Sequence, residues 1–221
     1  QTATGALAAG LLGGISEPSL YGIHLRFKKI YPRMLVGCFV GGLILGTQPS
    51  NFNKVLGYVV DGPTREVTYV EPKMQAIHAM LKKAFPGQSV NISGYNDTLS
   101  RVLFSASGAQ NPPSYHVLLD RKSIVTLGSQ RPWINDKDIG EQRWVTYPAR
   151  DGLNIPAILD LPVGWKAGDG PLPTIIHPHG GPWSRDAMGW DVSGWVPFLT
   201  SRGYAVLRPQ YRGSTDLGRK L

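Results

Sequence analysis

The chain has 221 residues, of which 42% are apolar, enough to bury one large core or two small ones. Its formal net charge of +8 comes from 23 basic and 15 acidic residues. These charges are scattered, with no block of five like charges, so the composition argues against a nucleic-acid-binding protein. The single cysteine, Cys38, excludes an intramolecular disulfide.

The first 46 residues differ in kind from the rest of the chain. They hold only five charged side chains, and small residues are frequent among them, as in helices that approach closely in lipid. The apolar stretch 34–46 has thirteen residues, fewer than the ~20 that cross a bilayer. Residues 1–46 are therefore predicted to be a short hydrophobic helical segment, an interrupted membrane span that is compatible with membrane contact.

Glu17 is the candidate functional residue of this segment. It stands in Gly-Ile-Ser-Glu-Pro, and a carboxylate in membrane-like sequence is costly unless it faces a protein cavity. The surrounding residues 13–29 resemble the membrane-spanning sugar permease component of the bacterial phosphotransferase system, which has Gly-Ile-Thr-Glu-Pro in a re-entrant loop at the sugar site. The resemblance implies that Glu17 hydrogen-bonds a sugar hydroxyl. A surface carboxylate at a helix start is the alternative interpretation.

Residues 47–53 form a polar junction, after which short strands alternate with turns. Strands are predicted at 55–60 and 66–70, followed by a helix that opens at Glu71-Pro72 and ends at Pro86-Gly87. Further strands are predicted at 89–93, 101–107, 115–119 and 123–127. This spacing is typical of propeller blades, so residues 54–128 are predicted to be a partial β-propeller segment.

A linker at 129–140 leads to the last module, residues 141–221. Two strands, at 144–147 and 155–161, are predicted around the turn Asp151-Gly152. The remaining elements are a strand at 174–176, the turn His179-Gly180-Gly181-Pro182, a helix within 191–202 and a strand at 205–207. This order predicts the opening of an α/β unit with a parallel strand pair.

The glycine turn carries the chemistry that the sequence indicates. A strand that feeds a glycine-rich turn presents bare backbone N–H groups to solvent, which suits stabilisation of a developing oxyanion in acyl transfer. No paired cysteines, metal-ligand motif or phosphate-binding loop occurs in the sequence, so neither a metal nor another cofactor is expected.

Three stretches of the last module resemble the start of the catalytic domain in the prolyl oligopeptidase family of serine peptidases. They span 149–162, 177–185 and 195–214, and are most similar to the acylaminoacyl- and dipeptidyl-peptidase branches. The resemblance implies an α/β-hydrolase domain preceded by a β-propeller, and hydrolysis of aminoacyl, dipeptidyl or oligopeptide substrates. It also implies Gly181 as the first and Gly180 as the second oxyanion donor, with His179 supporting the turn rather than acting as base.

The nucleophile of such an enzyme is not found in the sequence. Ser184, Ser193 and Ser214 do not stand in Gly-x-Ser-x-Gly, and Asp186 and Asp191 are better explained as helix caps. Arg212 is expected to form a structural salt bridge. We therefore expect a truncated α/β-hydrolase start that lacks its triad and is inactive.

The whole chain is interpreted as a chimera of a membrane-derived N-terminal fragment and a soluble peptidase part, cytoplasmic or periplasmic. A fragment of a phosphotransferase-system sugar transporter is the alternative function.

Overall fold

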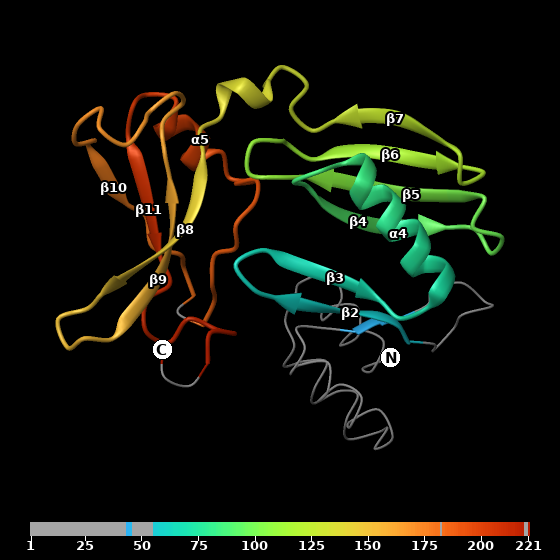
Figure 1. Cartoon of the computed structure of the whole chain (residues 1–221), viewed down its shortest axis with the longest axis horizontal. Helices are drawn as coiled ribbons and strands as arrows, with labels where there is room; N and C mark the ends of the chain where they lie inside the picture. Colours follow the sequence, from blue (N-terminus) through green and yellow to red (C-terminus); the bar gives the residue numbers. More distant parts are fainter. Residues whose placement is uncertain (1–42, 46–54, 182, 219–220) are drawn as a thin grey trace, which may run out of the picture.

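Three sheets and two α-helices make up the part of the chain that this computed structural model describes, residues 43–45, 55–181, 183–218 and 221 (Figure 1). The first sheet has the strand order β1-β2-β3, with bounds β1 (Leu43–Leu45), β2 (Val55–Asp61) and β3 (Arg65–Tyr69). The hairpin of β2 and β3 is antiparallel, and Gly57 is required in it because a Cβ there would lie 2.3 Å from the carbonyl oxygen of Thr68.

Strand β1 corrects part of the N-terminal prediction. The helical interpretation of 34–46 is wrong at residues 43–45, which pair antiparallel with β2 in the register Leu43 to Tyr58. The pairing satisfies backbone groups that β2 would otherwise leave open. Residues 1–42, which include Glu17, lie outside the described residues.

Helix α4 (Pro72–Ala84) is confirmed within two residues at each end. Glu71 caps its start by accepting a hydrogen bond from the backbone nitrogen of Met74 at 2.8 Å, and the proline at the first position cannot leave an N–H unpaired. Its buried face packs into one core with the second sheet, and the core includes Ile77, Leu81 and Phe104.

The second sheet is an antiparallel meander of four consecutive strands: β4 (Ser89–Tyr95), β5 (Arg101–Ser107), β6 (Ser114–Leu119) and β7 (Ser123–Ser129). All four predicted strands are confirmed, with shifts of two residues or fewer at their ends. In β5 every second residue is fully buried, as expected for a sheet with one face on a core.

The third sheet follows a 3-10 turn, η2 (Asp136–Asp138), and has the order β10-β11-β9-β8. Its elements are β8 (Gln142–Pro148), β9 (Asn154–Asp160), β10 (Thr174–Ile176), α5 (Trp195–Thr200) and β11 (Ala205–Pro209). Strands β10 and β11 are parallel, as predicted, and β8 and β9 form the predicted antiparallel pair.

The helix predicted within 191–202 is shorter in the structure. Residues 191–194 form a turn in which Gly194 has a φ of 80°, and the Asp191 carboxylate accepts a hydrogen bond from the backbone nitrogen of Val196 at 2.9 Å. Asp191 is therefore a cap, as predicted, although the helix that it caps begins only at Trp195.

The described residues are mostly sheet with few helices. None of the helices in this part of the chain has the length and apolar character that crossing a membrane requires.

Candidate active site around the glycine turn

The glycine turn starts where β10 leaves the third sheet. The backbone nitrogen of His177 still donates to the Leu207 carbonyl oxygen at 2.8 Å, which continues the pairing with β11 by one residue. Gly180 and Gly181, which follow, are both exposed. The turn therefore stands at the end of the edge strand β10 with its backbone open to solvent.

The two glycines are not equivalent. Gly181 has a φ of 143°, and a Cβ there would lie 2.8 Å from the Trp183 nitrogen and 3.1 Å from the Ser184 Cβ. A Cβ at Gly180 would meet nothing within 4 Å. Only at Gly181 does the turn require glycine, both for its backbone conformation and for space.

His179 is fixed to the turn that follows β11. Its Nε2 lies 2.8 Å from the Ser214 Oγ and its Nδ1 lies 2.8 Å from the Gly180 carbonyl oxygen. Its ring stacks on Tyr211 at a centroid distance of 4.3 Å, and the Tyr211 hydroxyl donates to the His179 carbonyl oxygen at 2.8 Å. This arrangement is what a supporting role for His179 would need, and the role itself stays a prediction.

Tyr211 and Ser214 are site residues that the sequence interpretation did not connect with the glycine turn. The predicted parallel pairing of β10 and β11 could have indicated this connection, because the carboxyl ends of parallel strands meet at one edge of a sheet. The residues directly after β11 were therefore the place to look for partners of the residues directly after β10.

Ser214 lies within hydrogen-bond distance of the His179 imidazole, yet its environment differs from that of a nucleophile. It is 5% exposed, and its hydroxyl donates to the Tyr211 carbonyl oxygen at 2.6 Å. The single hydroxyl proton lies between two acceptors, the Tyr211 carbonyl oxygen and His179 Nε2, and the burial of this hydroxyl keeps a substrate carbonyl away from it. Ser193 instead donates to the Asp191 carboxylate.

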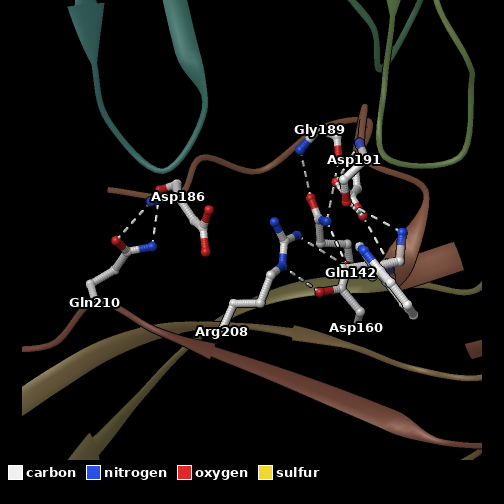
Figure 2. A network of polar contacts seen from close by, with 10 residues as sticks. Gln142, Asp160, Asp186, Gly189, Asp191, Arg208 and Gln210 are labelled. Carbon is white, nitrogen blue, oxygen red and sulfur yellow. Dashed lines mark hydrogen bonds and ion pairs between the residues drawn. The ribbon is translucent and has the colours of Figure 1, made fainter. Parts of the chain in front are cut away.

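Two glutamines hold the loop that follows the glycine turn (Figure 2). The buried Gln210 accepts from the Asp186 nitrogen at 3.0 Å and donates to the Asp186 carbonyl oxygen at 2.9 Å. Gln142 accepts from the Gly189 nitrogen at 2.7 Å and donates to the Gly189 carbonyl oxygen at 3.4 Å. Each side-chain amide thus pairs with one residue of the loop as a neighbouring strand would. The prediction that Asp186 caps a helix is wrong.

A buried ion pair lies between the two glutamines. Arg208 on β11 donates through its Nε to the Asp160 carboxylate on β9 at 2.9 Å, and both side chains are less than 10% exposed. Gln142 donates to the same carboxylate at 2.7 Å. Because buried charges need partners, this network is satisfied only while β8, β9 and β11 keep their register.

Arg212 forms the salt bridge that the sequence predicts. Its Nη2 contacts both carboxylate oxygens of Asp151, in the turn between β8 and β9, and this guanidinium lowers the pKa of the Asp151 carboxyl. The pair ties that turn to the one after β11. Within residues 55–181 and 183–218, no three His, Cys, Asp or Glu side chains gather as a metal site would require.

Comparison with known proteins shows what most of the chain is similar to. No protein-family model matches it. Dipeptidyl aminopeptidase BIII of Pseudoxanthomonas mexicana is 34% identical over 188 residues, which cover 81% of this chain and 26% of that protein. The homologues of this chain are peptidases of the prolyl oligopeptidase family. A crystal structure of a puromycin hydrolase mutant, 22% identical, has a TM-score of 0.50 over 74% of this chain and 25% of that one, so the fold is shared.

The N-terminal 46 residues have other relatives. They are 65% identical to part of the glucose-specific EIIBCA component of the phosphotransferase system in Corynebacterium glutamicum. The 46 matched residues cover 21% of this chain and 7% of that protein. Both resemblances predicted from the sequence are thereby confirmed. The chain spans about a quarter of the length of the prolyl oligopeptidase-family relative. Its first 46 residues are similar to a short piece of a sugar transporter component.

Proposed function

We propose that residues 55–221 are part of a serine-type peptidase that hydrolyses peptide bonds by acyl transfer. The observation that carries the proposal is the exposed Gly180-Gly181 turn directly after a strand that pairs in parallel with β11, in a chain whose relatives are peptidases. One of these relatives is named a dipeptidyl aminopeptidase, which favours aminoacyl, dipeptidyl or oligopeptide substrates for this chain as well.

The chemical role of the turn is to bind the negative charge that develops on the carbonyl oxygen of the substrate. Gly181 supplies the first backbone N–H and Gly180 the second, because a glycine lets that oxygen approach the amide closely. His179 keeps the turn in place through Ser214 and Tyr211. A donor that is already oriented costs no reorganisation when the charge forms.

We further propose the division of the chain that such a peptidase would have. Residues 141–221 would be the start of an α/β-hydrolase domain, which the parallel pair of β10 and β11 beside β9 and β8 supports. Residues 54–128 would be a β-propeller segment, supported by the four-stranded meander, with 129–140 as the linker.

The 221 residues alone should not hydrolyse peptides. Among the residues that the structure describes, no serine, histidine and carboxylate stand together as a catalytic triad. Only a small residual rate is expected from backbone donors without a nucleophile.

A segment exchange tests the proposed function. Residues 55–221 would replace the matching segment of dipeptidyl aminopeptidase BIII, and hydrolysis of a dipeptide amide would be measured in the exchanged enzyme. We expect hydrolysis to be retained, because the exchanged segment supplies an equivalent glycine turn. An enzyme that folds, as judged by circular dichroism, and binds substrate but does not hydrolyse it would contradict the proposal.

A second candidate function rests on the 65% identity of the first 46 residues to a sugar transporter component. In that case the segment would insert in a membrane and Glu17 would bind a sugar hydroxyl. Membrane fractionation of the full chain beside a chain that starts at residue 47 tests this: only the full chain should need detergent for extraction. Equal extraction of both in plain buffer would remove this candidate.

A further inference from the structure

The loop that follows the glycine turn contacts the first sheet, which is far away in the sequence. Arg185 donates from Nη1 to the Asp61 carbonyl oxygen at 3.0 Å and from Nη2 to the Gly62 carbonyl oxygen at 2.5 Å. The backbone nitrogen of Met188 donates to the Pro63 carbonyl oxygen at 2.7 Å. Three successive carbonyl groups of the β2–β3 turn are thus bound by one loop, and Figure 2 shows this hairpin reaching the loop beside Asp186.

The chemistry of the contact depends on arginine. Successive carbonyl oxygens in a tight turn point away from the hairpin and need outside donors, and the guanidinium offers two N–H groups in a fixed fork. A lysine ammonium at the same place is a single point with rotatable donors, so it cannot reproduce the paired geometry. The side chain of Arg185 is half-buried, which limits competition from water.

The same loop is held from its other side by the third sheet. The Ser184 carbonyl oxygen accepts from the Thr215 nitrogen at 3.0 Å, and Asp186 pairs with Gln210 through both of its backbone groups. Arg185 lies between these two residues and four residues after Gly181. The segment that leaves the glycine turn is therefore clamped between the third sheet and the β2–β3 turn.

We propose that Arg185 is a positioning residue for Gly181, so that the β2–β3 hairpin of the first sheet is part of the site. Arg185 does not face the exposed turn itself; it acts by fixing the loop that Gly181 leads into. The inference rests on the proposed function of the glycine turn, because it assigns Arg185 the task of keeping the Gly181 amide in one orientation.

The test measures backbone order in the full chain, by ¹⁵N relaxation and amide hydrogen exchange. In the wild type the order parameter of Gly181 should be about 0.85, the value of a rigid backbone, and Arg185→Ala should lower it below about 0.6. Arg185→Lys should give an intermediate value, because it keeps the charge and loses the fork. Arg202→Ala is the matched control, since that exposed guanidinium stacks on Phe198 and is not bonded to the β2–β3 turn.

The order parameter of Gly181 in the Arg185 variants decides whether Arg185 positions the glycine turn. If Arg185→Ala accelerates exchange of the Met188 amide and leaves the Gly181 order parameter unchanged, the loop does not transmit position and the inference is overturned. A wild-type Gly181 that is already mobile would overturn it as well. Should Arg185→Ala fail to fold, Arg185→Lys decides, and a wild-type order parameter in that variant would overturn the inference. Hydrolysis is not measured here, so an inactive segment exchange would reject the proposed function while leaving the positioning result intact.

Discussion

At Gly181 the backbone holds a φ of 143°, a conformation that residues with a Cβ rarely adopt. Gly181→Ala should destabilise the chain by about 1–3 kcal/mol, since it combines backbone strain with a contact of 2.8 Å to the Trp183 nitrogen. Gly180→Ala is the matched control and should stay within about 0.5 kcal/mol. Urea unfolding of both variants checks the difference, and equal stabilities would show that the turn does not hold this conformation.

The hydroxyl of Ser214 lies 2.8 Å from a nitrogen of the His179 imidazole, as the hydroxyl of a catalytic serine would. We predict no covalent adduct at Ser214 with a fluorophosphonate probe. The hydroxyl is buried and bonded to the Tyr211 carbonyl oxygen, so a probe phosphorus atom has no access to it. Mass spectrometry of probe-treated protein checks this, and an adduct at Ser214 would mean that a nucleophile is present after all.

Between elements, the strongest test concerns the buried ion pair that joins β9 and β11. Arg208→Met leaves the Asp160 carboxylate buried without its cation and should cost about 3–5 kcal/mol. Arg143→Met is the control, because its partner Glu141 is exposed and hydration replaces the lost contact. Denaturant unfolding of the two variants should differ clearly; a small effect of Arg208→Met would indicate that water reaches Asp160.

The elements themselves could be predicted from the sequence where local signals agree. Strands β4 to β7 and helix α4 have alternating or helical apolar spacing with turn residues at their ends, and their predicted bounds are within two residues of the structure. Helix α5 lies within its predicted range, but its start could not be predicted because Gly194 and Asp191 form a turn that helical spacing alone does not reveal.

The side chains that hold the loop after the glycine turn could not be predicted from local signals. Gln142 and Gln210 reach loop residues 47 and 24 positions away, and Arg185 reaches a turn 124 positions away. Local propensity carries no information on such pairs, because they depend on which loops the sheets bring together. The glycine turn could be predicted because glycines after a strand form a local pattern, and its chemical role stays a prediction.

Across the molecule, two buried histidines make stability depend on pH. Burial lowers the pKa of His78 below its ordinary value of 6.5, with the Lys82 charge adding to this and the hydrogen bond to Val90 opposing it. Burial also lowers the pKa of His116. The unfolded chain therefore binds protons more readily, so stability is fully present above about pH 6.5 and falls as the pH drops below it.

Unfolding curves between pH 7.5 and about pH 5 check this dependence. The double variant His78→Gln, His116→Gln should show a flatter decline than the wild type, whatever its absolute stability. A decline of equal steepness in both proteins would mean that other groups carry the pH dependence.

If the turn at Gly181 supplies a preorganised backbone donor to a peptidase, the kcat of the exchanged enzyme must depend on that glycine. Placed in dipeptidyl aminopeptidase BIII, the segment with Gly181→Ala should lower kcat by about 100-fold, because alanine cannot hold a φ of 143° and the displaced N–H no longer points at the oxyanion. The segment with Gly128→Ala should change kcat less than about threefold, because this glycine lies on β7 outside the turn and a Cβ there would meet nothing within 4 Å. Equal kcat values in the two exchanged enzymes would contradict the claim.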